Sequence, residues 1–252
     1  MPKLTLLEMA QNILSDMDSD EVNSINDTVE ALQVAEILKT TYFEIINQRD
    51  WAHMATLFQL TASGDSTKPT HMSLSDAISK VEWVKYNKIE SGGTRAKWDE
   101  VEYLTPEEFI ARVTSRDSSL STVTTVTEQS IPLYVYNDRA PEYYTTFDDE
   151  TLIFDAHDNT VDTTLQTSKT QCWGYKEPTW SMVDGAIPDL PTKAFPFMLA
   201  EAKSAAFNSL KQFPNQKEEQ KSRRQRYKLS RDHRRNEGRG VTFPDYGRDS
   251  NK

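Results

Sequence analysis

Apolar residues recur at helical spacing near both ends of the sequence. The first such pattern, in residues 3–17, consists of Leu6, Met9, Ile13 and Leu14. A second helix is expected over about 22 residues up to Arg49, with a capping box formed by Ser24 and Asp27. Its apolar residues fall on two stripes, Val29, Leu32, Ala35, Leu38, Tyr42 and Ile45, and Val34, Ile37 and Thr41. Two stripes indicate burial on two sides, either within one chain or between copies.

The C-terminal quarter also predicts two helices. The first, after residue 194, has one broad apolar face formed by Phe195, Met198, Leu199, Ala202, Ala205, Ala206, Leu210 and Phe213. Pro214 interrupts the pattern, and the stretch that follows is helical in propensity but almost without apolar residues. A polar helix of this kind is either solvated or lies on a partner.

The middle of the chain has the period of two that is typical of strands. The expected strands lie in residues 81–88, 97–105, 122–128, 131–137, 151–157 and 164–175. The first two are joined by the turn "SGGTR" and predict a hairpin. Thr105 and Pro106 predict the start of a short helix. Because no long crossover helix separates the strands, we expect an antiparallel sheet.

These patterns predict an α+β fold: a bundle of N- and C-terminal helices, an antiparallel β-rich insertion and an extended C-terminal arm. The expected division is 1–55 for the N-terminal helices, 56–186 for the insertion, 187–235 for the C-terminal helices and 236–252 for the arm.

Composition adds few restrictions on chemistry. The net charge is −10, and one cysteine, Cys172, excludes an intrachain disulfide. No stretch is apolar for long enough to predict a membrane span or a signal peptide, so we expect no membrane association and a reducing cytosol. Cys172, beside Trp173, is interpreted as a small buried apolar residue rather than a nucleophile.

No nucleotide-binding or hydrolase motif is present, and the four histidines, His53, His71, His157 and His233, show no metal-ligand spacing. The best candidate for an enzyme is the acidic block 148–158. Its charged residues are Asp148, Asp149, Glu150, Asp155, His157 and Asp158. Acidic residues at strand ends are usually solvated turns, so we expect no catalytic residues, no metal and no cofactor.

The last 30 residues differ in charge from the rest of the chain. Residues 223–252 hold 10 basic and 4 acidic residues, whereas the other 222 carry a balance of −16. Two glycines, Gly238 and Gly240, precede three anchor residues, Phe243, Pro244 and Tyr246. Linear peptides use such anchors to fill pockets, which favours a docking arm over a solubilising tail or a nucleic-acid-binding arm.

The order of these parts resembles the head-to-tail adaptor proteins of short-tailed bacteriophages, the tail tubular protein A group. Residues 4–51 supply a short helix, an acidic linker and a long helix that ends at Trp51. From residue 187, an acidic-Leu-Pro turn leads into an Ala-rich helix, a Pro/Asn break and a polar helix. These two segments cover about 90 of the 252 residues.

The resemblance implies a structural virion protein rather than an enzyme. Family adaptors form a ring, usually of twelve copies, which binds the portal protein through its C-terminal arm and seats the tail nozzle, while genomic DNA passes through the lumen without specific binding. The chain would belong to the portal vertex and tail of the virion, and to the host cytoplasm during assembly. An acidic body suits a DNA conduit, because walls of like charge do not retain a polyanion.

Two sets of residues carry these expectations. The residues expected to dock on the portal are Arg223, Arg224, Arg226, Arg234, Arg235, Phe243, Pro244, Tyr246 and Arg248. The residues expected at the ring or bundle interface are Leu32, Leu38, Tyr42, Ile45, Phe195, Leu199, Ala202, Ala206 and Leu210. Two alternatives stay open: a tail-associated glycan hydrolase using Glu150 and Asp155 as its carboxylate pair, and a nucleic-acid-binding protein that uses the tail alone.

Overall fold

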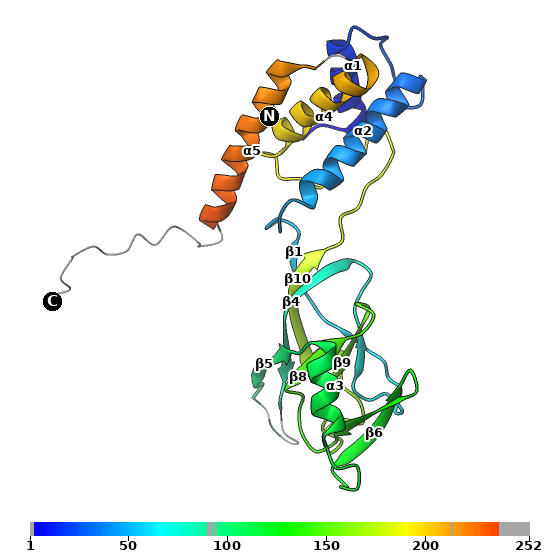
Figure 1. Cartoon of the computed structure of the whole chain (residues 1–252), viewed down its shortest axis with the longest axis vertical. Coiled ribbons are helices and arrows are strands. Elements are labelled where there is room, and N and C mark those ends of the chain that lie inside the picture. The colour runs from blue at the N-terminus through cyan, green and yellow to red at the C-terminus, as the bar shows by residue number, and fades with distance from the viewer. Residues whose placement is uncertain (1–2, 90–92, 94, 213, 237–252) are drawn as a thin grey trace, which may run out of the picture. The chain divides into compact units, whose positions relative to one another are not determined.

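The computed structural model of the chain describes residues 3–89, 93, 95–212 and 214–236, with side chains up to Arg231 in the last helix (Figure 1). It divides into two compact units. The helical unit comprises Met1–His53 and Pro178–Lys252, and the β unit comprises Met54–Glu177.

The helical unit is built from α1 (Leu6–Asp16), α2 (Val29–Ile46), α4 (Phe195–Leu210) and α5 (Gln216–Asn236). The first three pack against one another, and α5 packs along α4. A capping box between Thr5 and Glu8 starts α1, which satisfies backbone N–H groups that have no partner within the helix.

The segment that returns from the β unit ties the helices together. The backbone N–H groups of Leu6 and Leu7 donate to the carbonyls of Ala186 (2.8 Å) and Asp184 (3.1 Å). The Asp184 carboxylate also accepts the backbone N–H of Ile25 at 2.8 Å. One short segment therefore fixes both the start of α1 and the approach to α2.

The β unit contains a sheet of eight strands in the order β1-β10-β4-β5-β8-β9-β3-β2, which curls into a half-barrel. These strands are β1 (Ala55–Phe58), β2 (Thr61–Ala62), β3 (His71–Ser73), β4 (Ile78–Asn87), β5 (Trp98–Tyr103), β8 (Tyr143–Thr146), β9 (Thr151–Phe154) and β10 (Thr170–Lys176). A separate hairpin consists of β6 (Val123–Glu128) and β7 (Ile131–Tyr136), and a short 3-10 helix, η1 (Thr167–Lys169), precedes β10.

At β9 the sheet has core residues on both of its faces. On β9, the neighbouring side chains of Leu152 and Ile153 point to opposite sides and join different core clusters. The larger cluster contains Leu60, Met72, Val84, Tyr86, Val101, Tyr144, Leu152, Phe154, Leu165 and Cys172. The smaller one lies under helix α3 (Pro106–Thr114) and contains Phe109, Val113, Leu133 and Ile153.

The predicted fold class is wrong in two respects. The sheet is mixed, because β5 and β8 pair in parallel while the other neighbours are antiparallel. The prediction assumed that parallel strands need a long crossover helix between them. Here α3 and the β6–β7 hairpin together make the connection from β5 to β8. The terminal helices also do not form the predicted bundle, since α5 packs on α4 without comparable contact with α1 or α2.

The predicted capping box at Ser24 and Asp27 is also wrong. The Asp27 carboxylate accepts the backbone N–H groups of Asn23 (2.7 Å) and Ser24 (2.8 Å), which closes a turn before the helix. Thr28 caps α2 instead, by accepting the N–H of Ala31. The helix cap at Thr105, by contrast, is confirmed, with a capping box to Glu108 and Pro106 at the first helical position.

Gly174 permits the close approach of β10 to β4. A Cβ atom at this position would lie 2.1 Å from the carbonyl oxygen of Lys80. Trp173 pairs with Trp83, whereas the next residue, Gly174, pairs with Val81. Glu82 has no partner on β10 and is therefore the extra residue of a β-bulge. We expect Gly174→Ala to lower the free energy of unfolding by about 2 kcal/mol or more, because backbone must move. Urea unfolding followed by circular dichroism measures this change.

The matched control is Gly185→Ala in the helical unit, where an added Cβ would meet no atom within 4 Å. We expect this variant to be as stable as the wild type or slightly more stable. Equal effects of the two substitutions would show that β10 does not need the close approach.

Candidate functional site

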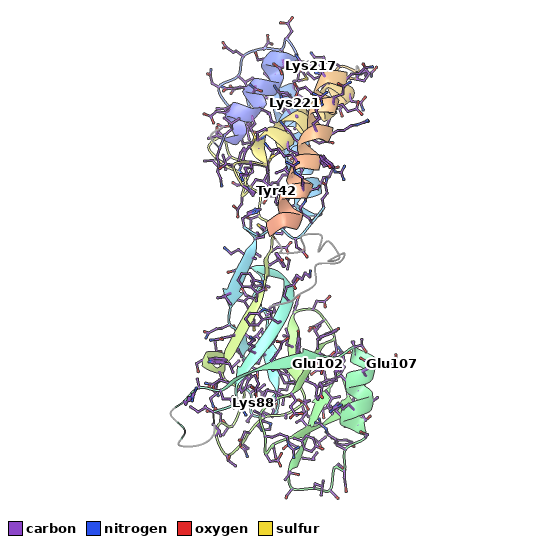
Figure 2. All side chains as sticks on the ribbon, turned by 90° about the vertical axis from the view of Figure 1, so that its left-hand side faces the viewer. Tyr42, Lys88, Glu102, Glu107, Lys217 and Lys221 are labelled. Atoms are coloured by element: carbon purple, nitrogen blue, oxygen red, sulfur yellow. The ribbon has the colours of Figure 1, made fainter. Side chains whose placement is uncertain are left out.

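A stripe of basic side chains runs along the exposed side of α5. It consists of Lys217, Lys221, Arg224, Lys228 and Arg231, all exposed. The spacing of alternately four and three residues places them on one face of the helix. The stripe, called here the α5 basic stripe, is about 21 Å long at the rise of an α-helix. Lys217 and Lys221, labelled in Figure 2, lie on the first two turns.

The opposite side of α5 lies on α4. Ser222 is buried there, and its hydroxyl donates a hydrogen bond to the carboxylate of Glu201 on α4. Within the stripe, Lys221 pairs with Glu218 at 3.1 Å. Arg224, Lys228 and Arg231 form no ion pair with any residue that the structure describes. Three cations on one face are thus available to a partner.

The other predicted docking residues are only partly placed. Arg223 pairs with Glu219 at 2.5 Å, and Arg226 is exposed near Arg49. Burial, together with the charge of Arg226, lowers the pKa of Arg49. The remaining predicted residues lie outside the described side chains: Arg234, Arg235, Phe243, Pro244, Tyr246 and Arg248.

Most residues expected at a ring or bundle interface are buried within a single chain. The buried members are Leu38, Tyr42, Ile45, Phe195, Leu199, Ala202 and Ala206. Leu210 is half-buried, and Leu32 is 43% exposed. Since α1 and α4 both pack on α2, its two apolar stripes need no second copy. Of this set, Leu32 is the residue that can meet another chain, together with its neighbour Val29, which is 75% exposed.

The acidic block is separated into two environments. Asp148 accepts the backbone N–H groups of Glu150 and Thr151 at 3.0 and 2.8 Å, and closes the turn between β8 and β9. Asp149 and Glu150 are exposed on this turn. Asp155 lies at the other end of β9 and is buried.

Asp155 forms a buried ion pair with Arg116, which follows α3. The guanidinium donates to the Asp155 carboxylate at 2.7 Å and to the carbonyls of Asp155 and Tyr134 at 2.6 and 3.1 Å. The other carboxylate oxygen accepts the N–H groups of Glu142 and Tyr143, each at 3.0 Å. Both carboxylate oxygens are thus occupied by structural hydrogen bonds.

The pair Glu150 and Asp155 does not have the geometry of a glycoside hydrolase. Glu150 precedes β9 and Asp155 follows it, so the length of a four-residue strand, about 13 Å, lies between the two residues. Glycosidase carboxyl groups lie about 5–9.5 Å apart. Asp155 is also engaged with Arg116, so this pair offers no free acid and base.

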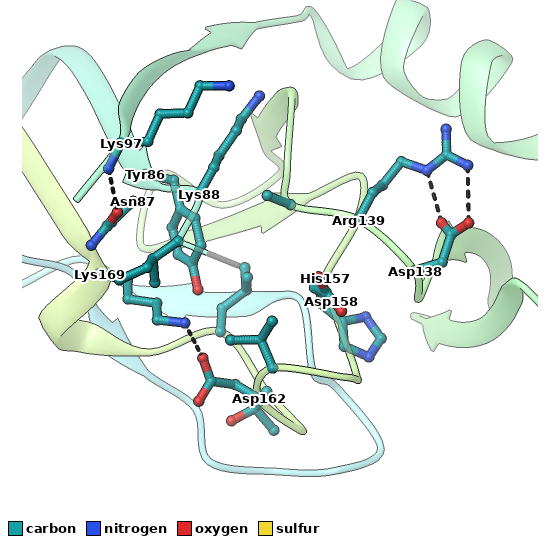
Figure 3. Close-up of a pocket in the computed structure, with 15 residues that line it drawn as sticks. Tyr86, Asn87, Lys88, Lys97, Asp138, Arg139, His157, Asp158, Asp162 and Lys169 are labelled. Carbon is teal, nitrogen blue, oxygen red and sulfur yellow. Dashed lines mark hydrogen bonds and ion pairs between the residues drawn. The ribbon is translucent and has the colours of Figure 1, made fainter. Parts of the chain in front are cut away.

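A cavity of about 280 Å³ lies between three loops of the β unit (Figure 3). The charged side chains that line it form ion pairs: Lys169 with Asp162 at 2.5 Å, and Arg139 with Asp138 at 2.8 Å. Lys88 and Lys97 share Asp99 at 3.6 and 3.9 Å, beyond hydrogen-bonding distance. Asp158 accepts the hydroxyl of Thr160 at 2.6 Å.

The same cavity includes His157 in its lining, a buried residue whose Nδ1 has no hydrogen-bond partner among the described residues. The charges in the walls nearly balance, and each carboxylate is engaged by a neighbour. The described residues that line the cavity therefore offer neither a nucleophile next to a base nor an excess of one charge, and we assign no reaction to them.

Cys172 is buried in the larger core cluster, as predicted, and burial raises its pKa to about 12. The thiol therefore stays protonated and is not a nucleophile at neutral pH. Among the described residues, no three histidine, cysteine or acidic side chains are grouped so that they could hold a metal ion. No helix in the described part of the chain combines the length and apolar character that a bilayer crossing needs.

Two features escaped the sequence analysis. Arg116 follows a short helix, and nothing in its neighbourhood identifies it as the partner of a residue 39 positions away. The bulge at Glu82 had one available signal, since a glycine inside a strand, here Gly174, marks a bulge or a close approach.

Comparison with known proteins adds no relative. No protein-family model matches the chain, and no curated protein shows significant similarity to it. The resemblance to phage adaptors therefore depends on the arrangement of segments in the sequence.

Replacing Arg116 tests the ion pair. We expect Arg116→Met to lower the free energy of unfolding by about 3–5 kcal/mol, because Asp155 is left buried without its counter-charge. Restoring neutrality in Arg116→Met/Asp155→Asn should recover part of this loss. Urea unfolding of the three proteins gives the comparison.

Arg139→Met is the matched control. Arg139 and Arg116 both stack on the Tyr136 ring, with Cζ at 4.1 and 4.0 Å from the ring centroid. Arg139 also pairs with an aspartate, Asp138, but its side chain is 51% exposed. An exposed pair contributes about 1 kcal/mol or less. If both variants lost the same stability, burial would not be what makes the Arg116 pair important.

The buried histidines predict how stability depends on pH. Burial lowers the pKa of His71 and His157 below the ordinary 6.5, more than the nearby carboxylates of Glu128 and Asp158 raise it. As pH falls through 6.5, the unfolded chain takes up protons first. The neutral histidines therefore contribute their full stabilisation of the folded state above about pH 6.5. This contribution is lost as the pH falls toward the pKa values of the two histidines in the folded state.

We accordingly expect the free energy of unfolding to fall between pH 7 and pH 5, and to fall less steeply in His71→Gln/His157→Gln. His53→Gln, in the helical unit, is the control. Chemical denaturation at several pH values measures the slope. An unchanged slope in the double variant would mean that other groups are responsible.

Proposed function

We propose that this chain is a structural virion protein, a ring-forming head-to-tail adaptor that binds the phage portal and seats the tail nozzle. Its place would be the portal vertex and tail of the virion, and the host cytoplasm during assembly. Genomic DNA would pass through the ring without specific binding. The order of segments in the sequence supports this proposal, and the α5 basic stripe is the structural observation that carries it.

The stripe has the form of a docking surface for an acidic protein. One side of α5 is fixed on α4 through Ser222 and Glu201, so the helix is held in place. The other side presents Arg224, Lys228 and Arg231 without an ion pair among the described residues. Arginine pairs with carboxylates through two parallel hydrogen bonds, which gives orientation as well as attraction.

One stripe alone would bind weakly. An exposed ion pair contributes about 0.2–1 kcal/mol, since water and salt screen it. A ring multiplies the contact, because each protomer brings its own stripe and the second contact forms at high effective concentration. The proposal thus needs many copies acting together, as the resemblance implies.

The charge of the whole chain favours a protein partner over nucleic acid. The net charge is −10 even with the basic segment included. Nucleic-acid binding depends on neutralising phosphates, and an acidic body opposes it. Carboxylates on a portal surface can be bound locally, whereas a long polyanion would meet the acidic remainder of the protein.

Contacts between neighbouring protomers would have to use exposed residues. On α2 these include Val29 and Leu32, two exposed apolar residues at helical spacing. Val29 and Leu32 thus take the place of the buried α2 and α4 residues as the proposed contacts between protomers, because those residues are already covered within one chain.

Neutralising the stripe tests the docking. We expect Arg224→Gln/Lys228→Gln/Arg231→Gln to weaken binding to the purified portal ring by about tenfold or more, because three ion pairs are lost in each protomer. The fold should persist, since the three side chains are exposed. Biolayer interferometry at two salt concentrations measures the affinity, and circular dichroism checks the fold.

The control removes the same charge from elsewhere on the helical unit, in Lys3→Gln/Lys39→Gln/Lys193→Gln. We expect it to bind as the wild type does. If the Arg224→Gln/Lys228→Gln/Arg231→Gln variant bound the portal ring as tightly as the wild type, the docking role of the stripe would be contradicted. Binding to duplex DNA that falls steeply with salt, without binding to the portal, would favour the nucleic-acid alternative.

A further inference from the structure

A groove of about 450 Å³ opens in the β unit between strands β4, β5, β8 and β9. Its floor is apolar and includes Leu152 and Tyr144, both part of the larger core cluster. Its rim is polar and includes Glu82 and Asp149. We call it the Tyr103 groove after the aromatic residue at its side. A volume of this size is within the range of small-ligand sites.

Tyr103 presents an aromatic ring to the groove in a fixed orientation. The side chain is 49% exposed. Its ring packs edge-on against Tyr144 at 5.5 Å, and Tyr144 in turn contacts Phe154 at 5.9 Å. The ring is thus supported by buried aromatic residues and keeps part of its surface free for a ligand.

The two carboxylates reach the groove through local departures from regular structure. Glu82 is the extra residue of the β-bulge opposite Gly174, and bulges re-aim side chains next to binding sites. Asp149 lies on the β8–β9 turn, where its N–H donates to the Thr146 hydroxyl at 2.9 Å. Lys80 pairs with Glu82 at 3.0 Å, so two acceptors and one donor stand around an aromatic ring.

This combination indicates the class of ligand. An anion would meet two carboxylates and one lysine, and a wholly apolar molecule would leave the carboxylates desolvated without partners. A sugar has an apolar face of C–H groups, which can stack on an aromatic ring, and hydroxyl groups that donate to carboxylates. We propose that the Tyr103 groove binds a short neutral oligosaccharide, with one sugar ring on Tyr103 and hydroxyls donating to Glu82 and Asp149.

The proposal concerns binding and not cleavage, and it does not depend on the adaptor function. It gives the β unit a role of its own, the recognition of a glycan. It also accounts for two features of one site, the bulge at Glu82 and the exposed ring of Tyr103.

Saturation-transfer-difference NMR of the full chain tests it. The probes are maltose, lactose, chitobiose and mannobiose, which together offer glucose, galactose, N-acetylglucosamine and mannose rings. We expect transfer to at least one disaccharide, strongest at the ring protons that stack on Tyr103. Tyr103→Ala and Asp149→Asn should each reduce this signal at least fivefold, while Tyr103→Phe should largely retain it.

Tyr227→Ala is the matched control, because Tyr227 is also exposed, at 73%, but lies on α5. It should leave the signal unchanged. Absence of transfer to all four disaccharides, or equal transfer in Tyr103→Ala, would overturn the proposal. A self-association of the chain that Tyr103→Ala abolishes, with no signal from any sugar, would identify the groove as a contact between copies. That result would also overturn the sugar-binding proposal.

Discussion

The buried ion pair of Arg116 and Asp155 joins the parts of the β unit that the sequence keeps far apart. Through five hydrogen bonds it connects the end of α3, the β6–β7 hairpin, the start of β8 and the end of β9. The Asp155 carboxylate holds the start of β8, where the chain returns to the sheet and pairs in parallel with β5. A charged pair in the interior is tolerated here because every oxygen is hydrogen-bonded.

The two units place different chemistry on their surfaces. In the helical unit, packing on α4 leaves one face of α5 free, and that face is basic. In the β unit, the features proposed for binding are irregular ones, namely a bulge, a turn and an exposed aromatic ring. The proposed docking of a protein depends on the first surface, and the proposed recognition of a small polar ligand depends on the second.

Local patterns in the sequence predicted local structure well. Helical spacing located α1, α2 and α4, and Thr105 with Pro106 located the start of α3. The hairpin of β4 and β5 is also confirmed. What could not be predicted depends on contacts between distant residues. The parallel pairing joins residues 41 positions apart in the sequence, and Arg116 meets Asp155 only in the folded sheet. The two stripes of α2 were correct as a pattern, but nothing local shows that α1 and α4 of the same chain pack on most of them while Val29 and Leu32 stay exposed.

Native mass spectrometry of the full chain, alone and mixed with the phage portal protein that is its proposed partner, tests the central claim most directly. The account predicts a large complex in the mixture, with about one copy of this chain for each portal subunit, and its loss at high salt. A chain that stays a monomer or dimer and ignores the portal would contradict the adaptor function.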